Sequence, residues 1–336
     1  MYIYSWSGNG NLGDDWIQEV GLQYFPSALR FEDSKLKFFN LAFFKNRLVP
    51  QKTRGHSLLI WGGGWIASDQ KKYKTMRRWA NHLRRFRKVY IFGSGMGPFE
   101  FDLTYVEKFF SSASGTIYTR SSIDRPVSYP NFRLSCDIAF LDKRMTIGNF
   151  STNQPRANKF ACSFPAWSER WLEQNPNLDE DKYKNFVVHL VQSLDPHREG
   201  LFVEFDAGGS GVSDSDYWSC LGLTVQRTAN IMEAKSLIEE TETFAAGRLH
   251  AGILAAMSGC KVVAIGYHHK FDILSEIGVY VEKSLDMPFS TMPIKANVSE
   301  IYKVRDRVHR ALEQFILENQ GSLLKPPLES TNRVKV

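Results

Sequence analysis

Cysteine is scarce in this sequence. The chain has 4 cysteines in 336 residues, and no two of them form a CxxC pair or another metal-ligand spacing. They lie far apart, at Cys136, Cys162, Cys220 and Cys260. This usage predicts reduced, mostly buried thiols in a cytoplasmic protein and gives no indication of a structural metal site.

Long apolar runs are absent as well. No stretch approaches the about 18 residues that a membrane-spanning helix requires. The first residues, MYIYSWSGNG, lack the charged region and apolar core that mark a signal peptide. We therefore expect a cytoplasmic protein whose contact with a membrane, if it makes one, is peripheral and at the inner face.

The length of the chain predicts two domains, because 336 residues exceed the usual size of one hydrophobic core. Both halves alternate strand and helix patterns, which favours two doubly wound, Rossmann-like α/β domains facing each other across a central cleft. We place the N-terminal domain at 1–145 and the C-terminal domain at 156–320, with a polar segment without periodicity between them. The tail, 321–336, is expected to be flexible.

The net charge of +6 and the pI near 9.0 indicate an attraction to anions. Much of the positive charge is clustered between Lys71 and Lys88, where a helix from about Thr75 would carry an apolar stripe. Two interpretations remain open: a solvated face of a helix packed on a sheet, or peripheral contact with an anionic membrane. Because no recognisable motif surrounds the cluster, we do not expect nucleic-acid binding.

Three strand patterns of the first half run into glycine-rich loops. Strands predicted at 1–6, 57–61 and 89–92 precede glycines at Gly8 to Gly13, at Gly62, Gly63 and Gly64, and at Gly93, Gly95 and Gly97. Glycine lets the backbone approach a ligand closely, so three such loops at one edge of a sheet favour a binding cleft over three unrelated tight turns. The first loop does not match the GxGxxG dinucleotide fingerprint.

Two polar residues follow the last strands of the first half. A strand at 116–119 leads to Arg120, and a strand end near Leu134 leads to Asp137. Arg120 is a candidate anion-binding residue at the same sheet edge. The alternative is an ordinary surface arginine.

The strongest chemical signal lies between Phe244 and Lys270. A strand ending at Ala246 is followed by a helix from Leu249 and a buried strand at 262–265. Arg248 and His250 thus lie at the amino end of a helix, just beyond the carboxyl end of a strand, where open α/β sheets bind ligands.

This position suits an anion. The free amides and the dipole of the helix attract negative charge, and the guanidinium of Arg248 offers a bidentate fork. Lys270 leaves the next strand at the same edge. In the alternative interpretation, Arg248 pairs with a neighbouring acid, His250 caps the helix and Lys270 is solvated.

Two further predictions concern the second half. The apolar run at 186–191 predicts another buried strand. The loop DAGGSGVSDSD, at 206–216, has three acids among glycines and serines and suggests mobility or contact with an acceptor.

Taken in order, these motifs resemble the polysaccharide pyruvyl transferase family over roughly residues 1–285. The resemblance rests on N-x-G-D from Asn11 to Asp14, the triple glycine, the G-x-G-x-G-P loop ending at Pro98, Arg120 and Asp137 at strand ends, and RLHA (248–251) before Y-x-x-K (267–270).

The resemblance implies a fold like that of type B glycosyltransferases. It also implies transfer of pyruvate from phosphoenolpyruvate onto two hydroxyls of a sugar, forming a cyclic ketal on a cell-surface glycan, such as exopolysaccharide or capsule, or on its lipid-linked precursor. Arg248, Leu249 and His250 would bind the donor in the C-terminal domain, and the N-terminal domain would hold the acceptor. The other substrate-binding residues would be Arg120, Asn11, Gly63, Gly64 and Gly95.

The chemistry fits these residue types independently. Phosphoenolpyruvate carries a carboxylate and a phosphate, which Arg248, Lys270 and Arg120 could bind. Protonation of its methylene carbon and attack by a hydroxyl need an acid and a base; His250 is the first candidate, and Asp14 is the second, as a base or as a ligand to a sugar hydroxyl. No step requires a metal or a cofactor.

Two alternatives remain. A nucleotide-sugar-dependent glycosyltransferase of the same fold would use the same cations for a diphosphate. A non-catalytic anion- or glycan-binding protein would rely mainly on the basic cluster from Lys71 to Lys88.

Overall fold

The structure is a computed structural model, which describes residues 1–5, 10–30, 56–63, 86–95, 113–120, 131–147, 155–167, 172, 179–208, 212–285 and 292–323. The chain divides into two compact units. The first comprises residues 1–6, 17–138 and 307–336, and the second comprises residues 7–16 and 139–306.

These units differ from the predicted ranges in three segments: residues 7–16 and 139–145 belong to the second unit, and the residues from 307 onward belong to the first. Residues 7–16 belong to the second unit, because Leu12 N donates to Phe205 O (2.7 Å) and Ala207 N donates to Gly10 O (3.1 Å). The helix α11 (Val298–Leu323) ends in the first unit, where Phe315 packs against Phe92 and Tyr118 at ring distances of 5.1 and 5.7 Å. Helical structure thus extends to residue 323, into the predicted tail.

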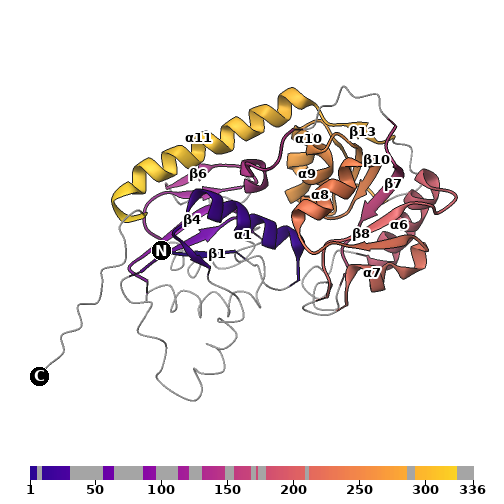
Figure 1. Ribbon diagram of the computed structural model, residues 1–336, viewed down its shortest axis with the longest axis horizontal. Coiled ribbons are helices and arrows are strands. Elements are labelled where there is room, and N and C mark those ends of the chain that lie inside the picture. The colour runs from indigo at the N-terminus through magenta and orange to yellow at the C-terminus, as the bar shows by residue number, and fades with distance from the viewer. Residues whose placement is uncertain are drawn as a thin grey trace, which may run out of the picture. The chain divides into compact units, whose positions relative to one another are not determined.

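The first unit is built on a parallel sheet (Figure 1). Its strand order is β2-β1-β3-β4-β5-β6, and every pair is parallel. The strands are β1 (Tyr2–Tyr4), β2 (Leu29–Arg30), β3 (Ser57–Trp61), β4 (Lys88–Ser94), β5 (Ile117–Thr119) and β6 (Phe132–Leu134). The helix α1 (Leu12–Tyr24) presents Gly21 to Ile3 and Trp61, so closely that a Cβ atom there would collide with the Ile3 side chain.

The second unit is built on a parallel sheet of order β12-β11-β10-β7-β8-β9, with β13 (Ile294–Lys295) antiparallel to β11. The parallel strands are β7 (Asn158–Ser163), β8 (Leu201–Glu204), β9 (Thr224–Arg227), β10 (Thr241–Ala246), β11 (Lys261–Ile265) and β12 (Tyr280–Glu282). The helical segments are α6 (Glu180–Leu194), α7 (Asp214–Tyr217), η3 (Ser219–Leu221), α8 (Ile231–Glu239), α9 (Leu249–Met257), η4 (His269–Phe271) and α10 (Asp272–Glu276), after η2 (Ile138–Leu141) at the boundary between the units.

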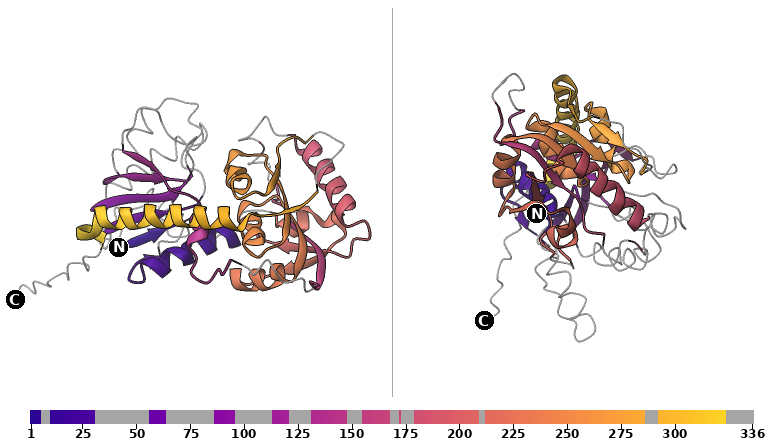
Figure 2. Two further views of the ribbon diagram at one scale, coloured as in Figure 1. Left: turned by 90° about the horizontal axis from the view of Figure 1, so that it is seen from above. Right: turned by 90° about the vertical axis from the view of Figure 1, so that its right-hand side faces the viewer.

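Both faces of this second sheet are covered (Figure 2). The helix α6 packs against the face that carries Cys162, Phe202 and Val263, whereas α8 and α9 lie side by side and α9 contacts β10 and β11. Residues 244–246 of β10 are consequently fully buried, as expected for a central parallel strand. The predicted doubly wound α/β fold is therefore confirmed for each unit.

The strands predicted at 57–61, 89–92 and 262–265, and the helix after Arg248, are confirmed within one or two residues. The strand predicted at 186–191 is wrong, because these residues belong to α6. The buried side chains of α6 recur at helical spacing, at Tyr183, Phe186, Val187, Leu190 and Val191. The paired valines favoured a strand, but the polar residues between the apolar ones lie on the opposite side of a helix.

Candidate active site

The predicted ligand crevice of the second unit lies at the carboxyl ends of β7 and β10. After β7 the chain adds β8 and β9 on one side of the sheet, and after β10 it adds β11 and β12 on the other side. The strand order therefore reverses between the neighbouring strands β7 and β10, which makes this position the topological switch point. The amides of Gly247 and Arg248 donate to Ser163 O at 2.8 and 3.3 Å. This turn holds Arg248 at the switch point, where open α/β sheets bind ligands.

The amino end of α9 points its backbone amides into this region. Arg248 takes the N-cap position in an extended conformation, and its side chain does not cap the helix. Among the described residues, the buried amides of Leu249 and Ala251 have no acceptor. Such a helix terminus favours a negatively charged group.

Arg248 forms a close ion pair inside the second unit. Its Nε and Nη2 each lie 2.5 Å from one oxygen of Asp214, whose side chain is fully buried, and Nη2 lies 3.3 Å from Oδ2 of Asp206. Burial opposes the charge of Arg248, but Asp214 and Asp206 outweigh it and raise the pKa of the guanidinium. Of the two interpretations of Arg248, pairing with a neighbouring acid is thus realised, by two short contacts with Asp214 and one longer contact with Asp206.

The segment from Asp206 to Tyr217 supplies these acids. Ser213 caps α7, and Asp214 also accepts a hydrogen bond from Ala166 N at 2.8 Å. Burial raises the pKa of Asp214, and the charge of Arg248 opposes this shift. The sequence singled out this loop for its acids but could not show that two of them lie on Arg248, because the pairing spans more than thirty positions of the chain.

The first glycine loop joins the same site. Asn11 bridges to Asp206, and its Oδ1 accepts hydrogen bonds from Gly13 N (3.0 Å) and Asp14 N (3.3 Å). Asn11 therefore caps α1. A Cβ atom on Gly13 would collide with Nδ1 of His250, so only glycine permits this approach.

His250 lies close enough to Asp14 to influence the pKa of its carboxyl group. Burial raises the pKa of Asp14, while His250, Arg248 and Lys270 oppose the shift. The Nζ atom of Lys270 lies 5.4 Å from the ring centre of Tyr267. The structure thus brings Asp14, Arg248, His250 and Lys270 together, as the sequence predicts.

Trp16 supports the imidazole of His250, a contact that the sequence did not reveal. The two rings meet edge to face with centroids 6.2 Å apart. The indole Nε1 donates to Asp142 Oδ2 at 2.7 Å, and Arg144 holds the same carboxylate with Nε and Nη2. Asp142 lies near the end of the predicted N-terminal domain, where nothing in the sequence pattern distinguishes it.

The predicted residues of the first half occupy the carboxyl edge of the other sheet. Arg120 forms an ion pair with Asp137 (3.2 Å), and both side chains are buried. Gly95 lies against the guanidinium of Arg120, and its amide donates to Gly63 O at 3.3 Å. Gly64, the loop beyond Gly95 and residues 71–85 of the basic cluster lie outside the described residues.

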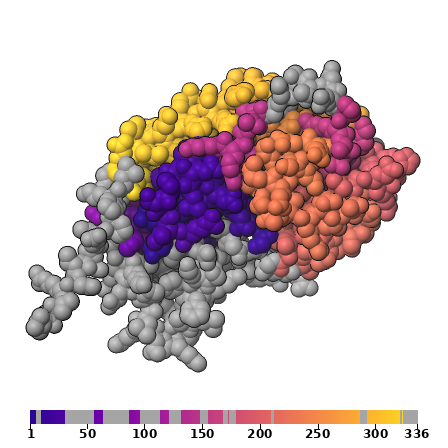
Figure 3. Space-filling view, viewed as in Figure 1, coloured from indigo at the N-terminus to yellow at the C-terminus, as the bar shows by residue number. Residues whose placement is uncertain are grey.

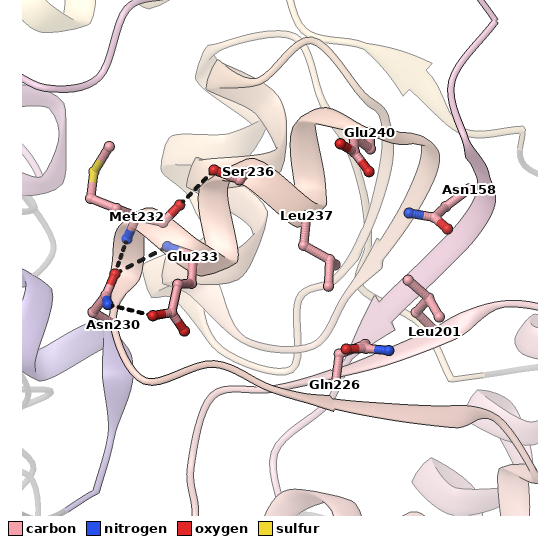
Figure 4. A pocket seen from close by; sticks show the side chains of 9 residues that line it. All are labelled: Asn158, Leu201, Gln226, Asn230, Met232, Glu233, Ser236, Leu237 and Glu240. Atoms are coloured by element: carbon pink, nitrogen blue, oxygen red, sulfur yellow. Dashed lines mark hydrogen bonds between the residues drawn. The ribbon is translucent and has the colours of Figure 1, made fainter.

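A groove beside α8 contains none of these residues (Figure 4). Asn158 and Leu201 line it from the first positions of β7 and β8, and Glu233 lines it from α8, whose outer side forms part of the surface in Figure 3. It therefore lies at the amino edge of the sheet, away from the switch point.

Within the described ranges, no three His, Cys, Asp or Glu side chains are grouped so that they could hold a metal ion. No described helix is long and apolar enough to cross a membrane.

A doubly wound sheet with cations, an acid and an imidazole at its switch point is typical of α/β enzymes. The chain belongs to the polysaccharide pyruvyl transferase family, whose model matches residues 11–269. This membership makes it a transferase of polysaccharide biosynthesis. No match was found among curated proteins.

Several solved structures are similar at low identity. An uncharacterised protein from Klebsiella pneumoniae is 14% identical with a TM-score of 0.45, over 81% of this chain and 85% of that one. A UDP-GlcNAc 2-epimerase from Methanocaldococcus jannaschii is 10% identical with a TM-score of 0.43, over 77% and 75%. The ADP-heptose LPS heptosyltransferase II from E. coli is 13% identical with a TM-score of 0.30, over 95% and 100%.

Proposed function

We propose that the protein transfers the pyruvyl group of phosphoenolpyruvate onto two hydroxyls of a sugar acceptor, forming a cyclic ketal. The observation that carries this proposal is the grouping of an uncapped helix terminus, Arg248 and Lys270 around the pair Asp14 and His250. The donor carries two anionic groups, and its reaction needs an acid and a base. The site offers groups suited to both requirements.

Donor binding uses the positive charges. The amides at the start of α9 and the ammonium of Lys270 suit the phosphate, which accepts hydrogen bonds on several oxygens. Asp214 binds Nε and one hydrogen of Nη2, so the other edge, formed by Nη1 and Nη2, is the one that a carboxylate would use, although Asp206 contacts Nη2 there at 3.3 Å. Leu249, buried at the first position of α9, fixes the turn between these groups.

The chemical step uses His250 and Asp14. Protonated His250 gives its proton to the methylene carbon of the donor, while an acceptor hydroxyl attacks the neighbouring carbon and passes its proton to Asp14. The raised pKa of Asp14 makes this carboxylate a better base than an ordinary aspartate. Phosphate then leaves with the electron pair of its C–O bond and takes the proton held by Asp14. The second hydroxyl attacks the same carbon and gives its proton to the now neutral His250, which closes the ketal and restores both groups.

The acceptor is expected to be a sugar of a cell-surface glycan, such as exopolysaccharide or capsule, or of its lipid-linked precursor. We also predict a cytoplasmic location. Contact with the membrane surface through residues 71–88 is a further prediction. A nucleotide-sugar-dependent glycosyltransferase would use the same cations, but no observation of the site favours it over the pyruvyl transferase.

Thermal unfolding with candidate donors tests the proposal. A ligand that binds only the native state raises its stability, by about 2.7 kcal/mol at a hundredfold excess over Kd. We expect phosphoenolpyruvate to raise Tm more than equal concentrations of phosphate, UDP-sugars or CMP-sugars. A rise in Tm with a nucleotide sugar alone would mean that the donor is a nucleotide sugar and not phosphoenolpyruvate. If no glycan acceptor led to release of phosphate from phosphoenolpyruvate, the proposed reaction would be contradicted.

A further inference from the structure

The guanidinium of Arg248 has two edges that can each bind a carboxylate. Asp214 occupies the first edge, because its two oxygens contact Nε and Nη2 at 2.5 Å. The contact between Nη2 and Asp206 Oδ2 must use the other hydrogen of Nη2, which belongs to the edge shared with Nη1. Asp206 therefore lies on the edge that an anionic substrate group would need.

The two acids hold Arg248 very differently. Asp214 makes two short hydrogen bonds and its side chain is fully buried, whereas Asp206 makes one contact of 3.3 Å and is 21% exposed. Charge-assisted hydrogen bonds of this kind normally measure about 2.7–2.9 Å. Asp214 is thus the fixed partner that orients the guanidinium, and Asp206 is a weak one.

The backbone around Asp206 allows its side chain to leave Arg248 without moving the chain. Its carbonyl accepts the amide of Asp214 at 3.0 Å, and the residue forms a β-bridge with Asn11. Its second oxygen, Oδ1, accepts the amide of Gly208 at 3.0 Å. A rotation of the side chain therefore breaks the contact with Nη2 and the hydrogen bond from Gly208 N, but leaves the backbone contacts with Asp214 and Asn11 in place.

We propose that Asp206 competes with the carboxylate or phosphate of the substrate for the second edge of Arg248, and that it thereby sets the affinity of the site for anions. The inference rests on the proposed function in that it takes this site to bind an anionic donor. An incoming anion forms two hydrogen bonds where Asp206 forms one, and the displaced carboxylate turns towards solvent. Without this competition, inorganic phosphate and other small anions would occupy the site more tightly.

The test compares Asp206→Asn with the wild type by calorimetric titration with inorganic phosphate and with phosphoenolpyruvate. Asparagine keeps the Oδ1 atom that accepts Gly208 N and removes only the charge that competes for Arg248. We expect Kd to fall about two- to fivefold for both ligands, which corresponds to the loss of a weak, partly exposed ion pair.

The matched control is Glu242→Gln, which removes one negative charge at the second position of β10, far along the strand from the switch point. Glu242 is 39% exposed and pairs with Lys159 and Lys261. The Glu242→Gln variant should bind inorganic phosphate and phosphoenolpyruvate with the Kd values of the wild type. Equal tightening in both variants would mean a general charge effect and would overturn the proposal.

The remaining outcomes separate the two claims. If Asp206→Asn tightens neither ligand, the competition does not exist, whatever the wild type does with phosphoenolpyruvate. If the variant tightens inorganic phosphate, but phosphoenolpyruvate binds no better than phosphate to either protein, the competition stands and the donor assignment fails.

Discussion

The indole of Trp16 meets the imidazole of His250 edge to face, with the ring planes at 75° and the centroids 6.2 Å apart. Because Trp16 is itself fixed by Asp142, the imidazole is backed by a rigid, buried wall. This arrangement limits the orientations of His250 and so serves an acid or base that must meet one atom of a substrate.

Trp16→Phe should destabilise the protein. The change removes the buried hydrogen bond to Asp142 Oδ2, and leaving that acceptor without its donor costs about 1–3 kcal/mol. Urea unfolding measures the loss. Trp167→Phe is the matched control, because among the described residues the buried Nε1 of Trp167 has no hydrogen-bond partner. If Trp167→Phe lowered the free energy of unfolding as much as Trp16→Phe does, the loss would come from the smaller ring and not from the missing hydrogen bond.

His250→Ala should abolish transfer while the protein stays folded. The loss of a general acid lowers turnover by about a hundred- to ten-thousandfold. Phosphate release in the presence of phosphoenolpyruvate and acceptor measures it. His197→Ala, at an exposed loop position, should retain wild-type turnover. Wild-type turnover in His250→Ala would remove the acid or base role.

Gly13→Ala should lower kcat more than it raises KM for phosphoenolpyruvate. The new Cβ atom would collide with His250, which must shift from its position beside Asp14. Crowding of this kind typically costs about 1–3 kcal/mol. Steady-state kinetics and Tm on one preparation separate the effect on His250 from a general loss of stability. Unchanged kcat would show that the imidazole tolerates the shift.

Asp14→Asn should change how stability depends on pH. Burial raises the pKa of Asp14 above its value of 3.8, so the folded protein binds a proton more tightly than the unfolded chain at this group. Its contribution to stability is therefore present at low pH and is lost as pH rises from 3.8 through the raised pKa. Denaturant titrations across this pH window should show that the free energy of unfolding falls less steeply with rising pH in the variant than in the wild type. The same pH dependence in both proteins would mean that folding does not raise the pKa of Asp14.

Asp214→Asn should destabilise the protein more than a comparable change at the surface. Removing the buried partner of Arg248 leaves a poorly compensated charge, which costs about 3–5 kcal/mol. Glu242→Gln removes an exposed pairing partner instead and should cost less than about 1 kcal/mol. Chemical denaturation compares the two. Equal costs would mean that Asp214 does not support Arg248.

Much of the candidate site could be predicted from local patterns. Arg248 and His250 stand between an apolar strand and an apolar helix, so their place at a sheet edge follows from neighbours within a few residues. The same holds for the glycines before α1. Residues 186–191 form a helix and not the predicted strand, because a short apolar run with valines fits either element until its buried positions are known.

The chain alone thus carries the alternation of strands and helices, the glycine-rich turns and the residue types of an anion site, because each depends on local spacing. Only the folded structure decides that Asp214 and Asp206 hold Arg248, and that Trp16 and Asp142 support His250. These contacts join residues up to two hundred or more positions apart, and the parallel sheet brings them together by its strand order, which no local pattern encodes.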